Sequence, residues 1–427
     1  MGVLGNRLRN AAYRRDGGFG KKEKTAMKKF LRSKFLPIAI AFTLILFLTN
    51  NFGLIDIEKT AIVIALGIDK RERGYEVTAQ IAVPQSTDSA PNADAMVKGK
   101  GVTIADALDD IGVTTGWYPL LSFCNLIVIS DELLKQDVMI FIDYFNRTDK
   151  IPDSSLLVAC KGKAADLLGV RTPLDSVPAF ALEKILVKDV AKLNRISFTN
   201  VKDFTKGYFS KSKSSFMPLI EEIKSQTAPE VKEGNGGQAP ESEKSGDAGG
   251  EQKVFDCTST LLFSKGVNVG KLDRDESLFF NIKRRKTKDT YFDLENVEWE
   301  DKKVSLTLGI DEEYKKFSLS LKKSPVFNVK LTLKCHVEDL QKSENVGELF
   351  TTQDIPEEVL KIAENKIKTI YENMTEKLRV ADCDLFGLTD ELYKYHFFKY
   401  DKYKDDILQK ATLNAEIKCK VERNTRT

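Results

Sequence analysis

The stretch FLPIAIAFTLILFLTNNFGLI (residues 35–55), followed by DIEKTAIVIALGIDKRERG (56–74) and YEVTAQIAV (75–83), decides how this chain is organised. Its first part has 21 residues and no formal charge. As a helix rising about 1.5 Å per residue it spans roughly 30 Å, the thickness of the hydrocarbon core of a bilayer. The parts that follow have the patterns of β-strands. The stretch therefore predicts a transmembrane anchor joined directly to a folded domain.

A cleavable secretory signal is the alternative interpretation, because the purely apolar part of the anchor covers only residues 35–48. Signal peptides end in small residues of the A-x-A kind, whereas this chain continues TNNFG at 49–53. We therefore favour an uncleaved signal-anchor. The apolar side chains predicted to form it are Phe35, Leu36, Ile38, Ile40, Phe42, Leu44, Leu46 and Leu48.

The segment before the anchor is short and basic. Residues 1–34 contain eleven Lys and Arg residues against Asp16 and Glu23, and such a flank stays in the cytoplasm under the positive-inside rule. The bulk of the chain is then expected on the outer side of the membrane. A nucleic-acid-binding tail is the alternative, but the interspersed glycines and the lack of helical patterning favour an unstructured topogenic segment.

The composition is that of a globular protein, with 42 % hydrophobic and 30 % charged residues. About 370 residues follow the anchor, enough for two or three domains. The basic tail more than accounts for the net charge of +3. The remainder is mildly acidic, so we expect no broad surface for nucleic acid or another polyanion.

The six cysteines stand alone in the sequence, without a CxxC pair and without a histidine at ligand spacing. A zinc site or a thioredoxin-like site is therefore not predicted. An exported domain could form disulfides, but Cys335 and Cys419 each fall on the apolar face of an alternating strand. Buried free thiols are the favoured interpretation.

Residues 56–224 are predicted to form the first outer domain. The apolar run at 60–68 is typical of a core strand covered on both faces, and DKRERG at 69–74 predicts a hairpin to the alternating strand at 75–83. Residues 85–101 predict a loop. Strands are also expected at 125–129 and 156–160, and helices at 103–111, 130–145, 178–194 and from Lys163 onward. This order indicates an α+β or α/β domain.

Residues 225–252 (SQTAPEVKEGNGGQAPESEKSGDAGGEQ) contain six glycines and no aromatic residue. Such a segment cannot bury enough apolar surface to offset the entropy of ordering, so it is predicted as a disordered linker, with a regulatory acidic segment as the alternative. Residues 253–427 then form a second outer domain, with strands at 254–263, 327–337 and 412–423 and a long helix at 356–380. A long helix on an antiparallel sheet is the simplest arrangement.

The fold class that follows is α+β. An N-terminal transmembrane helix precedes two or three mixed α/β domains, with largely antiparallel sheets flanked by helices. The predicted segments are a basic cytoplasmic tail (1–34), the anchor (35–55), the first domain (56–224), the linker (225–252) and the second domain (253–427).

Residues suited to catalysis are few. The only histidines are His336, on the polar face of a predicted strand, and His396, within the run YKYHFFKY at 393–400. Nucleophile, P-loop and dinucleotide motifs are missing, so we expect no enzyme activity and no cofactor. Carboxylates that are distant in sequence could still meet in the fold. The run 393–400 is more typical of the edge of an amphipathic core than of a binding surface, which is the alternative.

The order of several short motifs is similar to that of a known family. DIEKTAIVIALGID at 56–69, followed by GYEVT at 74–78, resembles the start of the mature Ger(x)C family, the C subunits of bacterial spore germinant receptors. LLVA and KGKA (156–159 and 161–164), FSKG (263–266) and DLFG (384–387) follow in family order, so the resemblance covers about residues 56–423. The residues singled out are Asp56, Gly67, Ile68, Asp69, Gly74, Phe386 and Gly387.

One feature departs from the family pattern. Family members are usually lipoproteins with a lipobox cysteine shortly before the first strand, whereas this chain reads NFGLID at 51–56 and has no cysteine before Cys124. Without a cysteine for lipid attachment, the interpretation of residues 35–55 as an uncleaved membrane anchor is favoured. A transmembrane helix also holds a protein in the membrane more firmly than one acyl chain does. It puts in doubt that the chain is an ordinary product of a receptor operon.

The resemblance implies a non-enzymatic subunit of a receptor at the spore inner membrane, with its soluble domains on the outer side. The implied partners are an A subunit with membrane spans and a permease-like B subunit, which is thought to hold the small-molecule germinant. For this chain we expect no direct small-molecule ligand, no metal and no nucleic acid. The alternatives are a membrane-tethered envelope hydrolase and a surface scaffold unrelated to germination.

Overall fold

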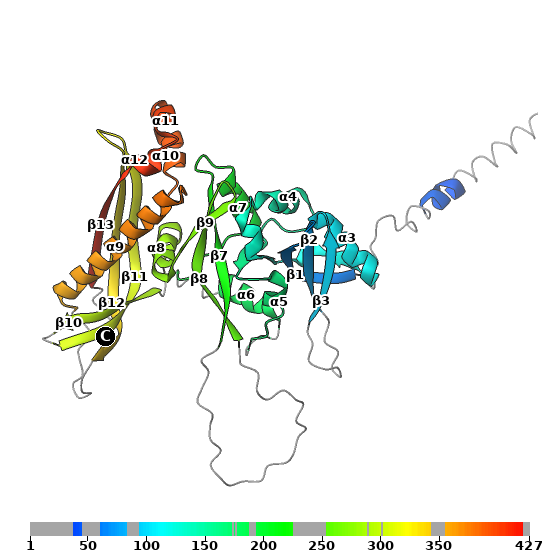
Figure 1. Ribbon diagram of the computed structural model, residues 1–427, viewed down its shortest axis with the longest axis horizontal. Helices are drawn as coiled ribbons and strands as arrows, with labels where there is room; N and C mark the ends of the chain where they lie inside the picture. Colours follow the sequence, from blue (N-terminus) through cyan, green and yellow to red (C-terminus); the bar gives the residue numbers. More distant parts are fainter. Residues whose placement is uncertain are drawn as a thin grey trace, which may run out of the picture. The chain divides into compact units, whose positions relative to one another are not determined.

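The structure is a computed structural model that describes residues 37–44, 60–82, 94–172, 175, 177–187, 194–224, 253–287, 290–299, 302–342 and 355–421. The chain divides into two compact units, Met1–Lys59 and Thr60–Thr427. Two sheets and the helices around them make up the second unit (Figure 1).

In the unit Met1–Lys59, residues 37–44 form an exposed helix, in which Thr43 Oγ1 donates a hydrogen bond to Ala39 O (2.8 Å). The remaining residues of the predicted anchor lie outside the described part of the chain, as does the tail at 1–34. Among the helices that the structure describes, none is long and apolar enough to cross a membrane. The transmembrane anchor therefore stays a prediction.

The larger sheet has nine strands in the order β3-β2-β1-β5-β6-β7-β8-β9, with β4 paired to the start of β1. The central pairs β1–β5, β5–β6 and β6–β7 are parallel, and the outer pairs are antiparallel. The strand bounds are β1 Thr60–Lys70, β2 Tyr75–Ala82, β3 Asp94–Gly101, β4 Tyr118–Leu120, β5 Leu126–Ile129, β6 Leu156–Cys160, β7 Ser214–Lys224, β8 Lys253–Ser264 and β9 Val267–Leu272.

This sheet is mixed, so the prediction of largely antiparallel sheets is wrong at its centre. The reason lies in the apolar runs of β1, β5 and β6, which are buried on both faces, as strands of parallel sheets are. Val63 and Leu66 of β1 join one apolar core, while Ile64 and Ala65 join the core on the other face. The prediction of a strand covered on both faces is confirmed.

Helices cover both faces of the larger sheet (Figure 1). The core on one face takes side chains from α3, η3, α4 and α7, and the core on the other takes them from α5 and α6. The bounds are α3 Ile104–Thr115, η2 Leu121–Phe123, η3 Asp131–Lys135, α4 Met139–Arg147, α5 Ala164–Leu168, α6 Pro178–Val187 and α7 Val201–Tyr208. The α+β class is confirmed.

Two local predictions in this half are wrong. Residues 94–101 are not loop but strand β3, which pairs with β2; residues 83–93 lie outside the described part. The single helix expected at 130–145 is divided into η3 and α4, because Val138 N–H donates to Gly266 O (2.9 Å) at the break. The hairpin between β1 and β2 is confirmed, and its Gly74 has a φ of 80°, which favours glycine.

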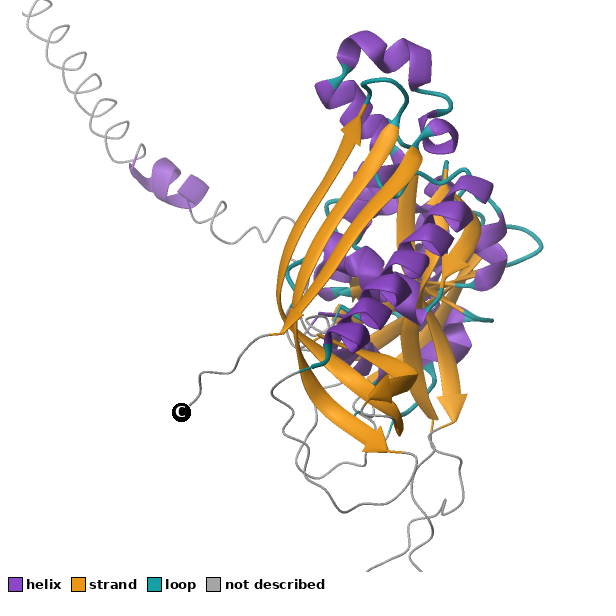
Figure 2. Ribbon diagram, turned by 90° about the vertical axis from the view of Figure 1, so that its left-hand side faces the viewer, coloured by secondary structure: helices purple, strands orange, loops and turns teal. Residues whose placement is uncertain are grey.

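The smaller sheet has the order β10-β11-β12-β13, and α9 lies across it (Figures 1 and 2). The elements of this half are β10 Thr290–Trp299, β11 Lys302–Ser320, β12 Val326–Lys342, β13 Thr412–Val421, α8 Arg274–Arg284, α9 Glu357–Val380, α10 Leu388–Tyr395, α11 Phe397–Tyr403 and α12 Ile407–Lys410. The predicted long helix is confirmed. The antiparallel sheet is corrected at β13, which runs parallel to β12 because helices α9 to α12 form a crossover between them.

The two sheets share apolar side chains. Phe216 of β7, Leu262 of β8 and Leu272 of β9 belong to the same buried cluster as the inner faces of β10, β11 and β12. Strands β8 and β9 follow residue 253 but pair with β7 in the larger sheet. The boundaries at 224 and 253 stay predictions, and the linker at 225–252 lies outside the described residues.

All six cysteines are free and buried, which confirms the prediction of buried thiols. Cys335 and Cys419 lie on the inner faces of the adjacent strands β12 and β13, in the core under α9. Burial raises the pKa of Cys124 and Cys257 to about 12, so these thiols are unreactive at neutral pH.

Candidate functional site

The family-like residues of the first half meet where β1 ends and α5 begins. The buried Asp69 carboxylate accepts hydrogen bonds from Ala164 N (2.8 Å) and Ala165 N (3.0 Å). It therefore caps α5 from a distant part of the sequence and joins the GID and KGKA motifs. Burial raises the pKa of the Asp69 carboxyl above its ordinary value, against the lowering effect of the two backbone hydrogen bonds.

Gly67 lets α5 pack directly on β1. A Cβ atom at Gly67 would lie 3.0 Å from Leu168 Cδ1 and 3.1 Å from Ala164 Cβ, which is tighter than ordinary contact. Ile68 beside it is fully buried. Asp56, the first of the family-like residues, lies outside the described residues.

The DLFG motif forms the turn before α10. The buried Asp384 carboxylate accepts hydrogen bonds from Leu388 N (2.9 Å), Thr389 N (2.7 Å) and Thr389 Oγ1 (2.8 Å), and so caps the helix. Gly387 has a φ of 70° immediately before the helix. Asp384 N–H donates to Ser214 Oγ of β7 (2.8 Å), which ties this turn to the larger sheet.

Phe386 and Lys283 fix the same turn to the smaller sheet and to α8. The Phe386 ring packs on Phe327 of β12 with a centroid distance of 4.7 Å. Lys283 Nζ donates to Phe386 O and lies 5.3 Å from the centroid of the Phe386 ring. Burial lowers the pKa of Lys283 to about 8, opposed by the nearby Asp384 and Glu391. No motif in the sequence indicated a role for this lysine.

His336 lies on the outer face of β12 between two carboxylates. Its Nδ1 is 2.7 Å from Asp311 Oδ2 and its Nε2 is 3.0 Å from Glu338 Oε2. Gly309 makes room for the ring, since a Cβ there would lie 2.4 Å from His336 Cε1. No group of ligands suited to a metal ion occurs among the described residues. The arrangement is that of a surface ion-pair cluster.

Stability should depend on pH through His336. Burial lowers its pKa, but the ion pairs with Asp311 and Glu338 outweigh burial and raise it above the ordinary 6.5. A histidine whose pKa is higher in the folded chain than in the unfolded chain stabilises the fold when it is protonated. This stabilisation is fully present below the pKa of the unfolded chain, and it is lost as the pH rises through the pKa of the folded chain. The stability difference between the wild type and His336→Gln should therefore be largest below the ordinary histidine pKa of 6.5 and should decrease as the pH rises above it.

This prediction is checked by thermal melts of both proteins between about pH 5.5 and 9, a range that brackets the ordinary histidine pKa. Asp311→Asn, which removes one of the two acceptors while keeping the histidine, should reduce the same pH dependence. A stability difference that stays constant across this range would contradict the prediction.

Four aromatic side chains of α10 and α11 are exposed, and we call them the aromatic face. Their exposed fractions are 42 % for Tyr393, 65 % for Tyr395, 61 % for Phe397 and 102 % for Phe398. The interpretation of the run 393–400 as the edge of a core is therefore wrong for these four. Tyr400, which follows them, does pack against the core.

The aromatic face is held in place on the β11–β12 turn. His396 Nε2 lies 3.2 Å from Leu319 O, and Lys399 Nζ donates to Leu321 O (2.7 Å). Edge-to-face contacts connect Tyr393 with Phe397 (5.6 Å between centroids) and with Tyr400 (5.1 Å). The same two helices and the β11–β12 turn also have exposed lysines, namely Lys322, Lys323, Lys394 and Lys402.

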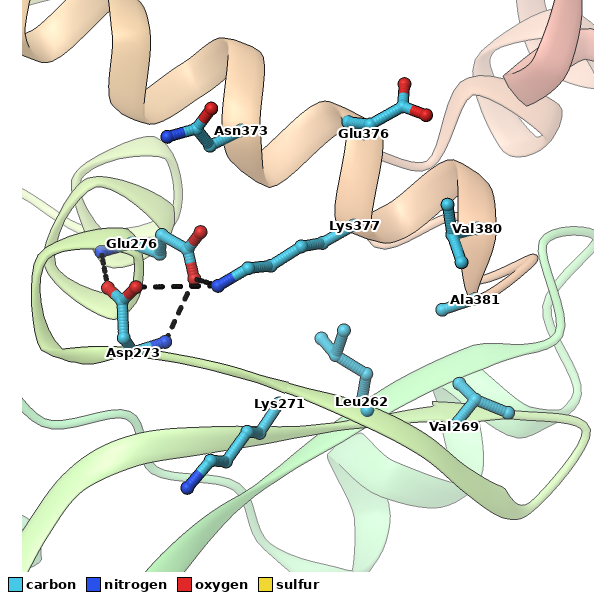
Figure 3. A pocket seen from close by; sticks show the side chains of 11 residues that line it. Leu262, Val269, Lys271, Asp273, Glu276, Asn373, Glu376, Lys377, Val380 and Ala381 are labelled. Atoms are coloured by element: carbon cyan, nitrogen blue, oxygen red, sulfur yellow. Dashed lines mark hydrogen bonds and ion pairs between the residues drawn. The ribbon is translucent and has the colours of Figure 1, made fainter.

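A pocket of about 520 Å³ lies between β9, the start of α8 and the last turns of α9 (Figure 3). Lys377 Nζ donates to Glu276 Oε2 (2.6 Å) and lies 3.4 Å from Asp273 Oδ2. Asp273 and Glu276 also form the capping box of α8. The Lys377 ammonium is paired with the Asp273 and Glu276 carboxylates, and these ion pairs connect α9 to α8. The three groups therefore stabilise the packing of the two helices and are not available to bind a ligand. The spacing D-x-x-E was the sequence signal for this cap.

Two family models of spore germination proteins match this chain. The family model described as spore germination protein N-terminal domain matches residues 54–222, and the model described as spore germination B3/GerAC like, C-terminal, matches residues 258–425. The chain is 22 % identical over 359 residues to spore germination protein KC of Bacillus subtilis (strain 168), covering 81 % of this chain and 84 % of that protein.

Two further proteins are similar to this chain. Spore germination protein B3 of Bacillus subtilis (strain 168) is 30 % identical over 152 residues, covering 34 % of this chain and 39 % of that protein. The crystal structure of the GerBC protein aligns with a TM-score of 0.48 at 16 % identity, covering 86 % of this chain and 99 % of that one. These relatives are named as germination proteins and not as enzymes, in agreement with the expected lack of catalysis. Since the two family models together match most of the sequence, the chain belongs to the Ger(x)C family of spore germination proteins.

Proposed function

We propose that this chain is a membrane-anchored C subunit of a spore germinant receptor, which acts by docking on an A subunit and a permease-like B subunit. Family membership supports the role in germination. The aromatic face of α10–α11 is the observation that carries the docking. It offers a second macromolecule a surface of large apolar side chains, with exposed lysines on the same helices and the adjacent turn.

The exposure of this face costs free energy in the isolated chain. Burying a phenylalanine side chain contributes about 1.5–3 kcal/mol, and Phe398 is fully exposed beside Phe397. Contiguous exposed aromatic groups mark interaction sites, and aromatic residues are enriched among the residues that dominate binding energies. Covering both rings with a partner would recover this free energy.

The two helices that form the aromatic face are also fixed to the rest of the fold by hydrogen bonds. The Asp384 cap fixes the start of α10, and Lys399 and His396 fix α11 on the β11–β12 turn. A face that is already ordered loses little entropy when a partner binds.

The predicted anchor at 35–55 completes the proposal. It would hold the chain in the spore inner membrane as a single-pass protein, with the basic tail in the cytoplasm and the folded unit outside. Confinement to the same membrane as its partners raises their effective concentration, so a single face of modest area is enough for assembly.

A pull-down from detergent-solubilised spore membranes tests the proposal. The wild-type chain, tagged at Thr427, should recover an A-like and a permease-like subunit. The double variant Phe397→Ala/Phe398→Ala should recover at least about tenfold less of both, since loss of two dominant contacts costs several kcal/mol.

Phe209→Ala is the matched control, because Phe209 is also an exposed phenylalanine (72 %) but lies after α7. It should recover both subunits at the wild-type level. Equal abundance of the three proteins in membranes is checked by immunoblot. If the wild type recovers neither subunit, the receptor proposal fails; if the double variant recovers them undiminished, docking does not use the aromatic face.

A further inference from the structure

A second group of exposed apolar side chains surrounds the first residues of β1, and we call it the β4 face. Its members come from β1, the last turn of α3, the turn between α3 and β4, β4 itself and η2. Their exposed fractions are 39 % for Ile62, 77 % for Val113, 48 % for Trp117, 39 % for Tyr118 and 55 % for Phe123. Neither a catalytic role nor the aromatic face accounts for this group, and it lies where the folded unit Thr60–Thr427 begins.

The β4 face is built directly on the start of β1. Strand β4 pairs in parallel with β1, placing Tyr118 opposite Thr60 and Leu120 opposite Ile62. Paired residues of adjacent strands lie about 4.8 Å apart and direct their side chains to the same face of a sheet. Tyr118 and Ile62 therefore extend one exposed surface beside the point where the chain enters the fold.

The backbone on either side of Trp117 is fixed. Gly116 ends α3 with a φ of 74°, and its N–H donates to Gly112 O (2.9 Å). Trp117 N–H donates to Thr115 Oγ1 (3.2 Å). The ammonium of Lys150 lies 5.9 Å from the centroid of the Tyr118 ring. The aromatic groups are thus presented from a short, well-anchored turn.

The length of chain before β1 limits how far this face can lie from a membrane. The predicted anchor ends at Ile55 and β1 begins at Thr60, five residues later. Five residues span at most about 18 Å, even when fully extended. The headgroup layer adds roughly 5–7 Å beyond the hydrocarbon core. With the predicted anchor in the bilayer, the start of β1, on which the β4 face is built, would therefore lie close to the lipid headgroups.

We propose that the β4 face lies in the headgroup layer of the bilayer, with Trp117 and Phe123 among the lipid headgroups. The inference rests on the membrane anchor of the proposed function and adds a second membrane contact to it. Tryptophan and tyrosine favour this layer, because their rings are apolar while their N–H and O–H groups remain hydrated. The face holds the folded unit in a defined orientation to the membrane, which a flexible tether alone would not do.

The charged residues beside the β4 face indicate whether binding requires anionic lipids. Asp106, Asp109 and Lys150 line the hollow between α3 and β4, so the rim carries both signs. Attraction to anionic lipids is not the driving force. The contact depends on aromatic burial, and it should persist in zwitterionic phosphatidylcholine and at high salt.

The two tryptophans of the chain make the experiment direct, because Trp117 is half exposed while Trp299 is 3 % exposed in the core. The full chain is reconstituted into phosphatidylcholine vesicles, with or without lipids brominated near the headgroup. Brominated lipid should quench the Trp117 share of the emission, in low and in high salt. The variant Trp117→Phe should lose this quenching and retain the emission of Trp299.

A relocated probe gives the matched control. In Trp117→Phe/Phe209→Trp the exposed tryptophan is moved to the end of α7, and its emission should be insensitive to brominated lipid. Thermal melts establish that both variants fold. Equal quenching at the two positions would overturn the proposal, because the β4 face would then have no special contact with lipid.

The failure of the anchor and the failure of this inference are distinguishable. Vesicle flotation after an alkaline wash comes first; a chain that does not float has no anchor, and the inference falls with it. A chain that floats while Trp117 stays unquenched keeps its anchor and overturns the inference. In spores, a photo-crosslinking residue at Phe123 should label lipid, and labelling of a protein subunit instead would overturn the lipid contact.

Discussion

Replacing Asp384 by alanine should lower the free energy of unfolding by about 2–4 kcal/mol, the combined cost of a lost helix cap and of buried donors without an acceptor. The carboxylate accepts three hydrogen bonds, two of them from the backbone N–H groups of Leu388 and Thr389. Alanine leaves both N–H groups buried and unsatisfied. The effect is large because the same turn connects α10 to β7 through Ser214.

The measurement is denaturant unfolding of the full chain in detergent. Asp405→Ala is the matched control, since Asp405 is an exposed carboxylate of the same helical region and should change stability by less than about 0.5 kcal/mol. Asp384→Asn should lie between the two, because it keeps one acceptor oxygen but turns an amide donor toward N–H donors. Equal stability of Asp384→Ala and the control would contradict the assigned role.

Asp384→Ala should also weaken docking. The aromatic face begins within α10, so fraying of this helix removes the order on which the face depends. At temperatures where the rest of the chain remains folded, the variant should recover less of the receptor subunits than Asp405→Ala.

Elements with strong local signals were predictable from the sequence. The apolar run of β1, the glycine-ended hairpin, the Thr103 cap of α3 and the stripe of α9 each lie within a short window. Thr103 Oγ1 accepts from Asp106 N (3.2 Å), as a capping threonine should. The apolar residues that recur at helical spacing within the predicted helix 356–380 are buried on α9, namely Val359, Ala363, Ile367, Ile370, Met374 and Leu378.

The contacts that make up the candidate sites were not predictable, because they join distant parts of the chain. Asp69 and the start of α5 are 95 residues apart, and Asp384 and Ser214 are 170 residues apart. The order of the family-like motifs placed each residue in the sequence but not against its partner. A single sequence contains no signal for such pairs.

The run 393–400 shows a second limit. Alternation of aromatic residues and lysines fits the edge of a core and an exposed binding surface equally well, since both present rings beside flexible charged chains. Only the packing of α11 on the β11–β12 turn decides that Tyr400 faces inward while Phe397 and Phe398 face outward.

The prediction of a loop at 85–101 is wrong for strand β3, and two glycines of this strand show the reason. Gly99 and Gly101 favoured a loop in the sequence, yet both lie in a strand directly beneath α3. Glycine within a strand often marks close approach of another backbone. A Cβ atom at Gly99 would lie 2.0 Å from Ala107 O and 2.6 Å from Ile111 Cγ1. The helix would have to move to admit even one methyl group.

Gly99→Ala should therefore destabilise the fold by about 1–3 kcal/mol or more, as overpacking against an unyielding neighbour does. Gly270→Ala is the matched control, because its added Cβ would lie 3.6 Å from Leu262 Cδ1, an ordinary contact in strand β9. Since β3 is at the edge of the sheet, the loss should be local. Hydrogen exchange should show reduced protection of β3 and α3 in Gly99→Ala. The protection of β5 and β6 should not change. Unchanged protection of α3 would mean that the close packing of this helix on Gly99 does not contribute to its stability.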